Sequence, residues 1–142
     1  MSLSIAKART IISSALAAGE SADMQPLAVL VLDAGGHPLA FERQDGASFG
    51  RFDIANGKAR GALSLGVGSR ALMARAEVAP SFVAAATAAL GGTLIPVPGG
   101  VIVADADGHH IGAVGVSGDN SDNDETAAVA GISAAGLTPV PG

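Results

Sequence analysis

Two segments of this chain repeat one pattern, and that repeat constrains the fold more than any other feature. Val29–Leu32 and Val101–Ala104 are short apolar runs, each followed by an aspartate- and glycine-rich stretch and then by a histidine, His37 or His109. Apolar runs of this length, joined by such turn residues, are typical of β-hairpins. Because a hairpin pairs its strands antiparallel, the repeat predicts an antiparallel sheet.

Helical patterns surround the two hairpins. Apolar residues recur at helical spacing in several segments, with serine or proline near their starts and glycine near their ends. We therefore expect an α+β fold, in which helices pack on an antiparallel sheet. The predicted helices are Ser4–Ala18, Asp53–Leu65, Ser69–Arg75, Ser81–Leu90 and Ser121–Ala135, and the predicted strands are Leu27–Leu32, His37–Arg43, Thr93–Val97, Val101–Ala104 and His109–Ser117. Residues 137–142 are rich in proline and are expected to form a loose tail.

Length and composition predict one domain that associates with itself. The 142 residues suit a single domain with one core. Charged residues make up 15% and apolar residues 49% of the chain, whereas about 25% charged residues is usual in a soluble domain. Burial of surface between copies would explain this composition, and we expect a homo-oligomer. The alternative is that small alanine and glycine residues raise the apolar share without making an adhesive surface.

Charge and residue usage exclude several classes of partner. The net charge is −5, and tryptophan and tyrosine are absent, so neither a basic surface nor stacking side chains for nucleic acid are available. Without cysteine, the chain has no disulfide and no thiolate metal site. The longest aliphatic run, Leu27–Leu32, is too short to cross a membrane. No signal peptide is visible at the start of the sequence, so we expect a cytoplasmic protein.

Three charged residues are candidates for a ligand site or a catalytic site. Arg43 and Asp45 stand where a strand runs into a flexible loop, and Arg43 could bind a ligand carboxylate; the alternative is a weak surface ion pair between them. Lys58 lies among alanine and glycine, which would leave room for a ligand or a second subunit. It could bind an anion, act as a base or form an imine, or it could be an ordinary solvated lysine.

Other polar groups carry weaker signals. His37 and His109 occupy the same place in the two hairpins, which favours a role in turn packing over ligation, and no pair of histidines has zinc-site spacing. We expect no metal site. The acidic stretch Asp119–Glu125 lacks the glycine and glutamate positions of a calcium loop. Capping of the last helix, with Ser121 as the cap, explains this stretch better.

In combination, several of these segments resemble the haem-binding HbpS/GlcG/PduO C-terminal-like family. The match runs in order along nearly the whole chain, and its most specific part is the string from Gly112 to Gly118 with the acidic residues that follow. The matching segments are Arg43 with Asp45-Gly46-Ala47, Lys58-Ala59, Pro96-Val97-Pro98-Gly99-Gly100-Val101, Gly112-Ala113-Val114-Gly115-Val116-Ser117-Gly118 and Asp122-Asn123-Asp124-Glu125.

This resemblance implies a five-stranded antiparallel sheet flanked by helices, profilin-like, that assembles as dimers up to octamers. Some relatives bind haem, so haem or another tetrapyrrole is the cofactor that the family suggests. The matched positions that would line a pocket are Arg43, Asp45, Lys58, Ser117, Gly118 and Asp119.

Three functional hypotheses remain open. The leading one is a homo-oligomeric protein that binds haem or a small carboxylated molecule through the pocket residues. A second is an enzyme acting on a small oxo- or hydroxy-acid, with Asp45 as acid/base and Lys58 as anchor or base. A third is an assembly subunit with a vestigial pocket.

Overall fold

The computed structural model describes residues 1–142 and shows an α+β fold built on one five-stranded sheet. The strand order is β2-β1-β4-β3-β5, and every neighbouring pair is antiparallel. The predicted fold class is therefore confirmed. The elements are α1 (Ile5–Ser21), β1 (Ala28–Asp33), β2 (Pro38–Arg43), α2 (Arg51–Leu65), α3 (Ser69–Val78), α4 (Pro80–Ala89), β3 (Gly100–Ala104), β4 (His110–Ser117), α5 (Ser121–Ala134) and β5 (Thr138–Val140).

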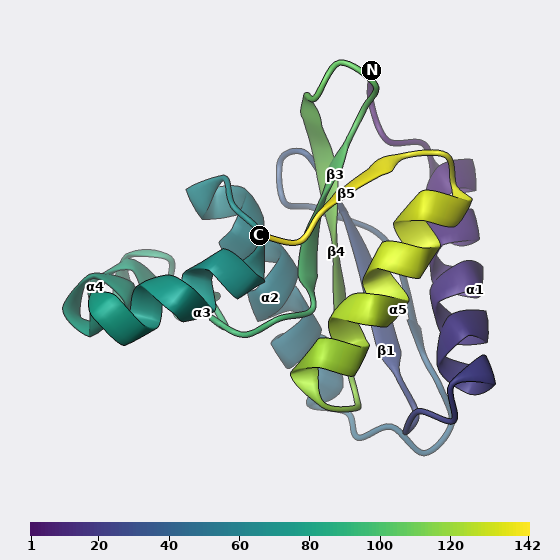
Figure 1. The fold of residues 1–142 in the computed structure, drawn as a ribbon, viewed down its shortest axis with the longest axis horizontal. Coiled ribbons are helices and arrows are strands. Elements are labelled where there is room, and N and C mark those ends of the chain that lie inside the picture. Colours follow the sequence, from purple (N-terminus) through teal and green to yellow (C-terminus); the bar gives the residue numbers. More distant parts are fainter.

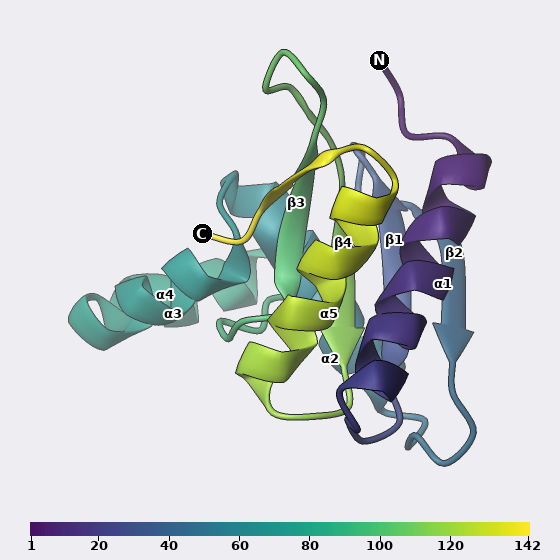
Figure 2. The ribbon, with the colours of Figure 1, turned by 45° about the vertical axis from the view of Figure 1, so that its right-hand side comes forward.

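Helices cover both faces of the sheet. Helices α1 and α5 lie side by side on one face, α2 lies on the other, and α3 and α4 project from the body as an arm (Figure 1, Figure 2). The buried strand β1 serves both sides, since Val29 and Val31 join the core beneath α1 and α5, while Leu30 and Leu32 join the core beneath α2. This position explains why β1 is apolar throughout rather than alternating. No helix is both long and apolar enough to cross a membrane.

Two paired glycines let α2 lie directly on the sheet. Gly100 of β3 pairs with Gly115 of β4, and both face α2. A Cβ on Gly115 would stand 2.0 Å from the carbonyl oxygen of Ala55, and a Cβ on Gly100 would stand 2.2 Å from that of Lys58. Any side chain at either position would push the helix away, so these glycines set the distance between the helix and the strands.

The identity of the fifth strand differs from the prediction. Residues 93–97 form no strand, and the edge place beside β3 is taken by Thr138–Val140 from the tail that was expected to be loose. The amide of Ile95 donates to the carbonyl of Gly57, so residues 93–97 cross α2 instead of entering the sheet. This leaves the outer edge of β3 free for the tail, and an edge strand tolerates its proline, Pro139.

The two hairpins form as expected and share one turn geometry. In the first, Oδ1 of Asp33 accepts hydrogen bonds from the amides of Gly35 and His37, at 2.9 and 3.0 Å. In the second, Oδ1 of Asp105 accepts from the amides of Asp107 and His109, both at 2.9 Å. Each histidine is the last residue of its turn, and its exposed ring lies beside the aspartate of the same turn.

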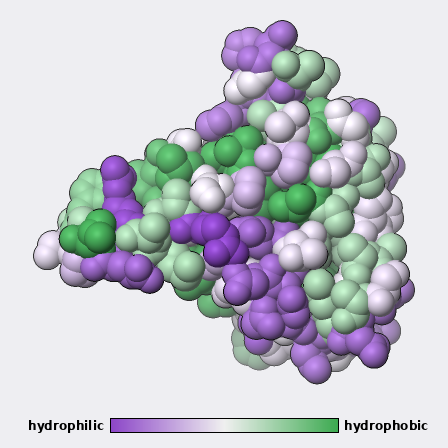
Figure 3. All heavy atoms as spheres, in the orientation of Figure 1, coloured by the Kyte–Doolittle hydropathy of each residue, from purple (hydrophilic) through white to green (hydrophobic).

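The projecting arm exposes apolar side chains. Leu72 of α3 and Val83 of α4 form a small core with Leu94, which follows α4. Val78 and Phe82, in contrast, are 84% and 47% exposed. Figure 3 shows hydrophobic and hydrophilic groups interspersed along this arm. An exposed arm of this composition suits contact with another protein surface.

Candidate functional site

The predicted site residues gather at one end of the sheet. Ala28, at the start of β1, pairs with Arg43 on one side and with Ser117 on the other. Asp45 follows β2, and the Gly118–Asp119 turn follows β4. Antiparallel pairing thus brings together chain segments that are far apart in sequence. The three histidines belong to the opposite end, since His37 precedes β2 while His109 and His110 stand at the start of β4.

Lys58 lies in the interior and does not reach the surface. Its side chain is 2% exposed, and Nζ donates to Oδ2 of Asp124 at 2.9 Å and to the carbonyl of Val116 at 3.0 Å. The small neighbours of Lys58 were expected to leave room for a ligand. Instead, Gly57 and Gly61 contact Ile95 and Leu94, so another segment of the same chain fills the space beside the helix. The lysine therefore joins α2 to α5 around the end of the sheet.

Burial dominates the electrostatics of this ion pair. Burial lowers the pKa of Lys58 below its ordinary value, although the carboxylate of Asp124 works in the opposite direction. Burial likewise raises the pKa of Asp124, and the attraction of Lys58 offsets only part of that rise. Burial thus opposes the charged form of each group, while their mutual attraction favours it.

The turn after β4 is tied to the same ion pair. Oδ1 of Asp124 accepts from the amide of Asp119 at 2.9 Å, and the buried hydroxyl of Ser117 accepts from the guanidinium of Arg51 at 3.1 Å. The acidic stretch caps α5 as predicted, but the cap is Asn120 rather than Ser121, with the Asn120 side chain accepting from the amide of Asn123.

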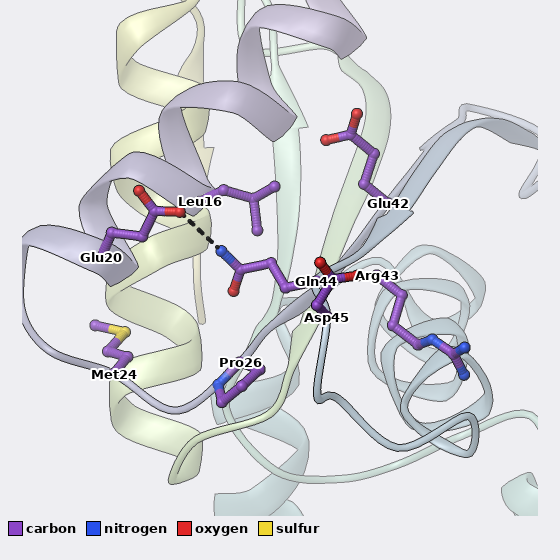
Figure 4. Close-up of a pocket in the computed structure, with 8 residues that line it drawn as sticks. All are labelled: Leu16, Glu20, Met24, Pro26, Glu42, Arg43, Gln44 and Asp45. Carbon is purple, nitrogen blue, oxygen red and sulfur yellow. Dashed lines mark hydrogen bonds between the residues drawn. The ribbon is translucent and has the colours of Figure 1, made fainter.

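A groove runs along α1 and the edge strand β2. It consists of two hollows of about 680 and 610 Å³ that share Glu42. We call it the α1–β2 groove. Its polar half is lined by Leu16, Glu20, Met24, Pro26, Glu42, Arg43, Gln44 and Asp45, and its apolar half by Ile5, Arg9, Thr10, Ile12, Ser13, Leu39, Ala40, Phe41 and Glu42. Figure 4 shows the polar half, with Met24 and Pro26 on the α1–β1 connection and Gln44 bonded to Glu20.

Two of the six predicted residues, Arg43 and Asp45, line this groove. They form no ion pair with each other. Figure 4 shows the Arg43 side chain extending away from Glu20 and Met24. Asp45 lines the polar half of the groove, whereas Lys58 is buried against Asp124 and does not line it. The two residues of the enzymatic hypothesis therefore do not share one site.

Sequence reasoning missed Arg9 and Met24. Arg9 lies on the same face of α1 as Ile5 and Ile12, within one helical turn of each, and lines the apolar half without an ion-pair partner. The sequence predicted both this helix and the strand that completes the groove, but it carried no signal that the two would lie side by side. Met24 follows the end of α1, and no local pattern marks it.

Comparison with known proteins gives one family and one fold. A family model described as haem degrading protein HbpS-like matches residues 3–133. Among curated proteins none matches at a significant level. A double mutant of Streptomyces reticuli HbpS is 30% identical, covers 94% of this chain and 86% of its own, and superimposes with a TM-score of 0.79.

Two further structures share the fold at lower identity. A PduOC–haem complex has a TM-score of 0.86 at 22% identity and covers 96% of this chain and 97% of its own. The ORFY protein of Klebsiella pneumoniae has a TM-score of 0.84 at 23% identity and covers 94% and 90%.

Proposed function

The chain belongs to the HbpS-like family, and from that premise we propose that it binds haem or another carboxylated tetrapyrrole in the α1–β2 groove and acts as a homo-oligomer. Support comes from the family and from the PduOC relative of the same fold, whose structure is a complex with haem. Each half of the groove also falls within the range of about 300–1,000 Å³ that is usual for small-molecule sites.

The observation that carries this proposal is an apolar hollow beside an arginine without a carboxylate partner. Ile5, Leu39 and Ala40 offer apolar contact, and Arg9 stands at the same hollow. A guanidinium binds a carboxylate through two parallel hydrogen bonds. A planar apolar ligand that carries carboxylates matches this combination. We therefore place the ligand carboxylates at Arg9.

The polar half suits the centre of a metal-bearing ring. Met24 supplies a thioether there, and Glu20, Glu42 and Asp45 supply negative charge that favours a cationic metal centre over the ligand carboxylates. Met24 would be the residue at this place able to hold the iron. When bound, haem would supply a redox-active iron at this place. Arg43 and Asp45 would then meet the ligand at the rim, while Lys58, Ser117, Gly118 and Asp119 support the wall of the groove from within.

The surface supports the proposed self-association. The chain carries few charges, and the large apolar side chains Phe49, Val78 and Phe82 are exposed. Contact between copies would cover them. Native mass spectrometry of the freshly purified protein measures the number of subunits and any ligand retained. A monomer at micromolar concentration would contradict the oligomeric part of the proposal.

A haem titration followed by the Soret absorbance tests the ligand. We expect saturable binding, and we expect Arg9→Ala to weaken it about tenfold, because one charge-assisted interaction is lost. Arg60→Ala is the matched control, since Arg60 is an exposed arginine on α2 that does not line the groove. The absence of a saturable shift at micromolar haem, or equal losses in the two variants, would overturn the proposal.

A further inference from the structure

One wall of the α1–β2 groove is the short connection between α1 and β1. Met24 and Pro26 line the polar half of the groove, and Gln25 stands between them. The connection begins with Asp23, whose φ of 57° lies in the left-handed region that favours glycine. The amide of Met24 donates to the carbonyl of Gly19 at 2.9 Å, which ties Met24 to the end of α1. We refer to Met24–Pro26 as the wall segment.

The turn after β4 contacts the next two residues, Gln25 and Pro26. Oδ2 of Asp119 accepts a hydrogen bond from the amide of Gln25 at 2.7 Å. Beside it, Gly118 approaches so closely that a Cβ there would stand 2.2 Å from the carbonyl oxygen of Pro26. The turn therefore contacts the wall segment at two successive residues, Gln25 and Pro26. One contact is a hydrogen bond to a charged acceptor and the other is direct packing.

Asp119 is itself held on its inner side. Its amide donates to Oδ1 of Asp124 at 2.9 Å, and Oδ2 of Asp124 receives the ammonium of Lys58. Its Oδ1 accepts from the amide of Asn120 and from the side-chain amide of Asn123, at 2.8 and 2.7 Å. A continuous chain of bonds thus runs from the buried ion pair to the wall of the groove. Its last link is the carboxylate of Asp119.

We propose that Asp119 is a positioning residue of the ligand site: its carboxylate fixes the wall segment, and the Lys58–Asp124 pair fixes Asp119. This inference rests on the proposed function, since it assigns the groove a ligand. It also changes the role expected for Asp119 from ligand contact to support of the residues that make that contact. The ligand would meet Met24 and Pro26, while Asp119 acts through Gln25.

The test compares Asp119→Ala with Asn120→Ala. Both variants lose a side-chain acceptor at the start of α5, so both lower stability, but Asn120 makes no hydrogen bond to the wall segment. We expect Asp119→Ala to weaken haem binding about tenfold and to shift the Soret maximum of the bound form, because the wall segment loses its hydrogen bond at Gln25. We expect Asn120→Ala to change the affinity by less than about twofold. Asp119→Asn retains one acceptor oxygen and should restore part of the affinity.

Hydrogen exchange of the Gln25 amide provides a readout that requires no ligand. Asp119→Ala should accelerate exchange at Gln25, and Asn120→Ala should not. Should the wild-type protein fail to bind haem, the proposed function is wrong, whereas exchange at Gln25 still decides whether the carboxylate holds the wall. Unchanged exchange at Gln25 in Asp119→Ala, or equal loss of affinity in both alanine variants, overturns the positioning role.

Discussion

Replacing Lys58 by methionine tests what the buried ion pair contributes to stability. Methionine fills a similar space without charge, and it leaves the carboxylate of Asp124, which is 1% exposed, without its cation. Breaking a buried pair in this way costs about 3–5 kcal/mol. That is a large part of the roughly 5–15 kcal/mol that stabilises a typical domain. For a chain of this length we expect the Tm to fall by about 10–15 °C.

The loss should depend on pH in a direction that the structure determines. Burial already raises the pKa of Asp124 from its ordinary value of 3.8, and removal of Lys58 takes away the main attraction opposing that rise. A carboxyl group whose pKa is higher in the folded than in the unfolded state stabilises the fold below the unfolded pKa, and that stability is lost as pH rises through the folded pKa. Lys58→Met should therefore be less stable at pH 8 than at pH 5.

Urea denaturation at the two pH values measures this difference, and a double variant is the control. In Lys58→Met/Asp124→Asn neither charge of the buried pair remains, while the side-chain oxygen of the introduced asparagine can still accept from the amide of Asp119. We expect the double variant to recover stability relative to the single variant and to lose the excess destabilisation at pH 8. A cost below about 1 kcal/mol for Lys58→Met, or an equal cost at both pH values, would refute the reasoning.

Two further predictions concern the sheet. Gly115→Ala should destabilise by about 3 kcal/mol or more, because its Cβ would stand 2.0 Å from the carbonyl of Ala55, whereas Gly50→Ala meets no atom within 4 Å and should be tolerated; thermal unfolding of the pair checks this. Deletion of residues 138–142 removes the strand paired with β3 and the bond from the Arg70 amide to Pro141. It should cost about 2–4 kcal/mol in urea denaturation, and an unchanged midpoint would mean that β5 contributes nothing.

Much of the fold could be predicted from local sequence. The two hairpins were visible because aspartate and glycine fix a turn within a few residues, and the carboxylates of Asp33 and Asp105 accept hydrogen bonds from residues that follow closely. The helices were visible because their apolar residues recur with the helical period. Such signals involve residues only a few positions apart, so they can be recognised in a single sequence.

The choice of the fifth strand was beyond such signals. Residues 93–97 and 138–140 are both short, apolar and bounded by proline or glycine. The first crosses α2 and the second joins β3. Only the segment that reaches the free edge of β3 can become the fifth strand. Which segment reaches that edge depends on how the other elements have packed.

For the candidate site too, the sequence identified residues, and the tertiary structure decided where they lie. Local sequence was enough to single out Arg43, Asp45 and Lys58 and to surround them with hairpins and helices, while the family resemblance added Ser117, Gly118 and Asp119. It took the folded chain to show that Lys58 is buried against Asp124, 66 residues further along, while Arg43 and Asp45 line an open groove. The burial of a charge depends on what lies across from the lysine in space, and its neighbours in sequence carry no record of that partner.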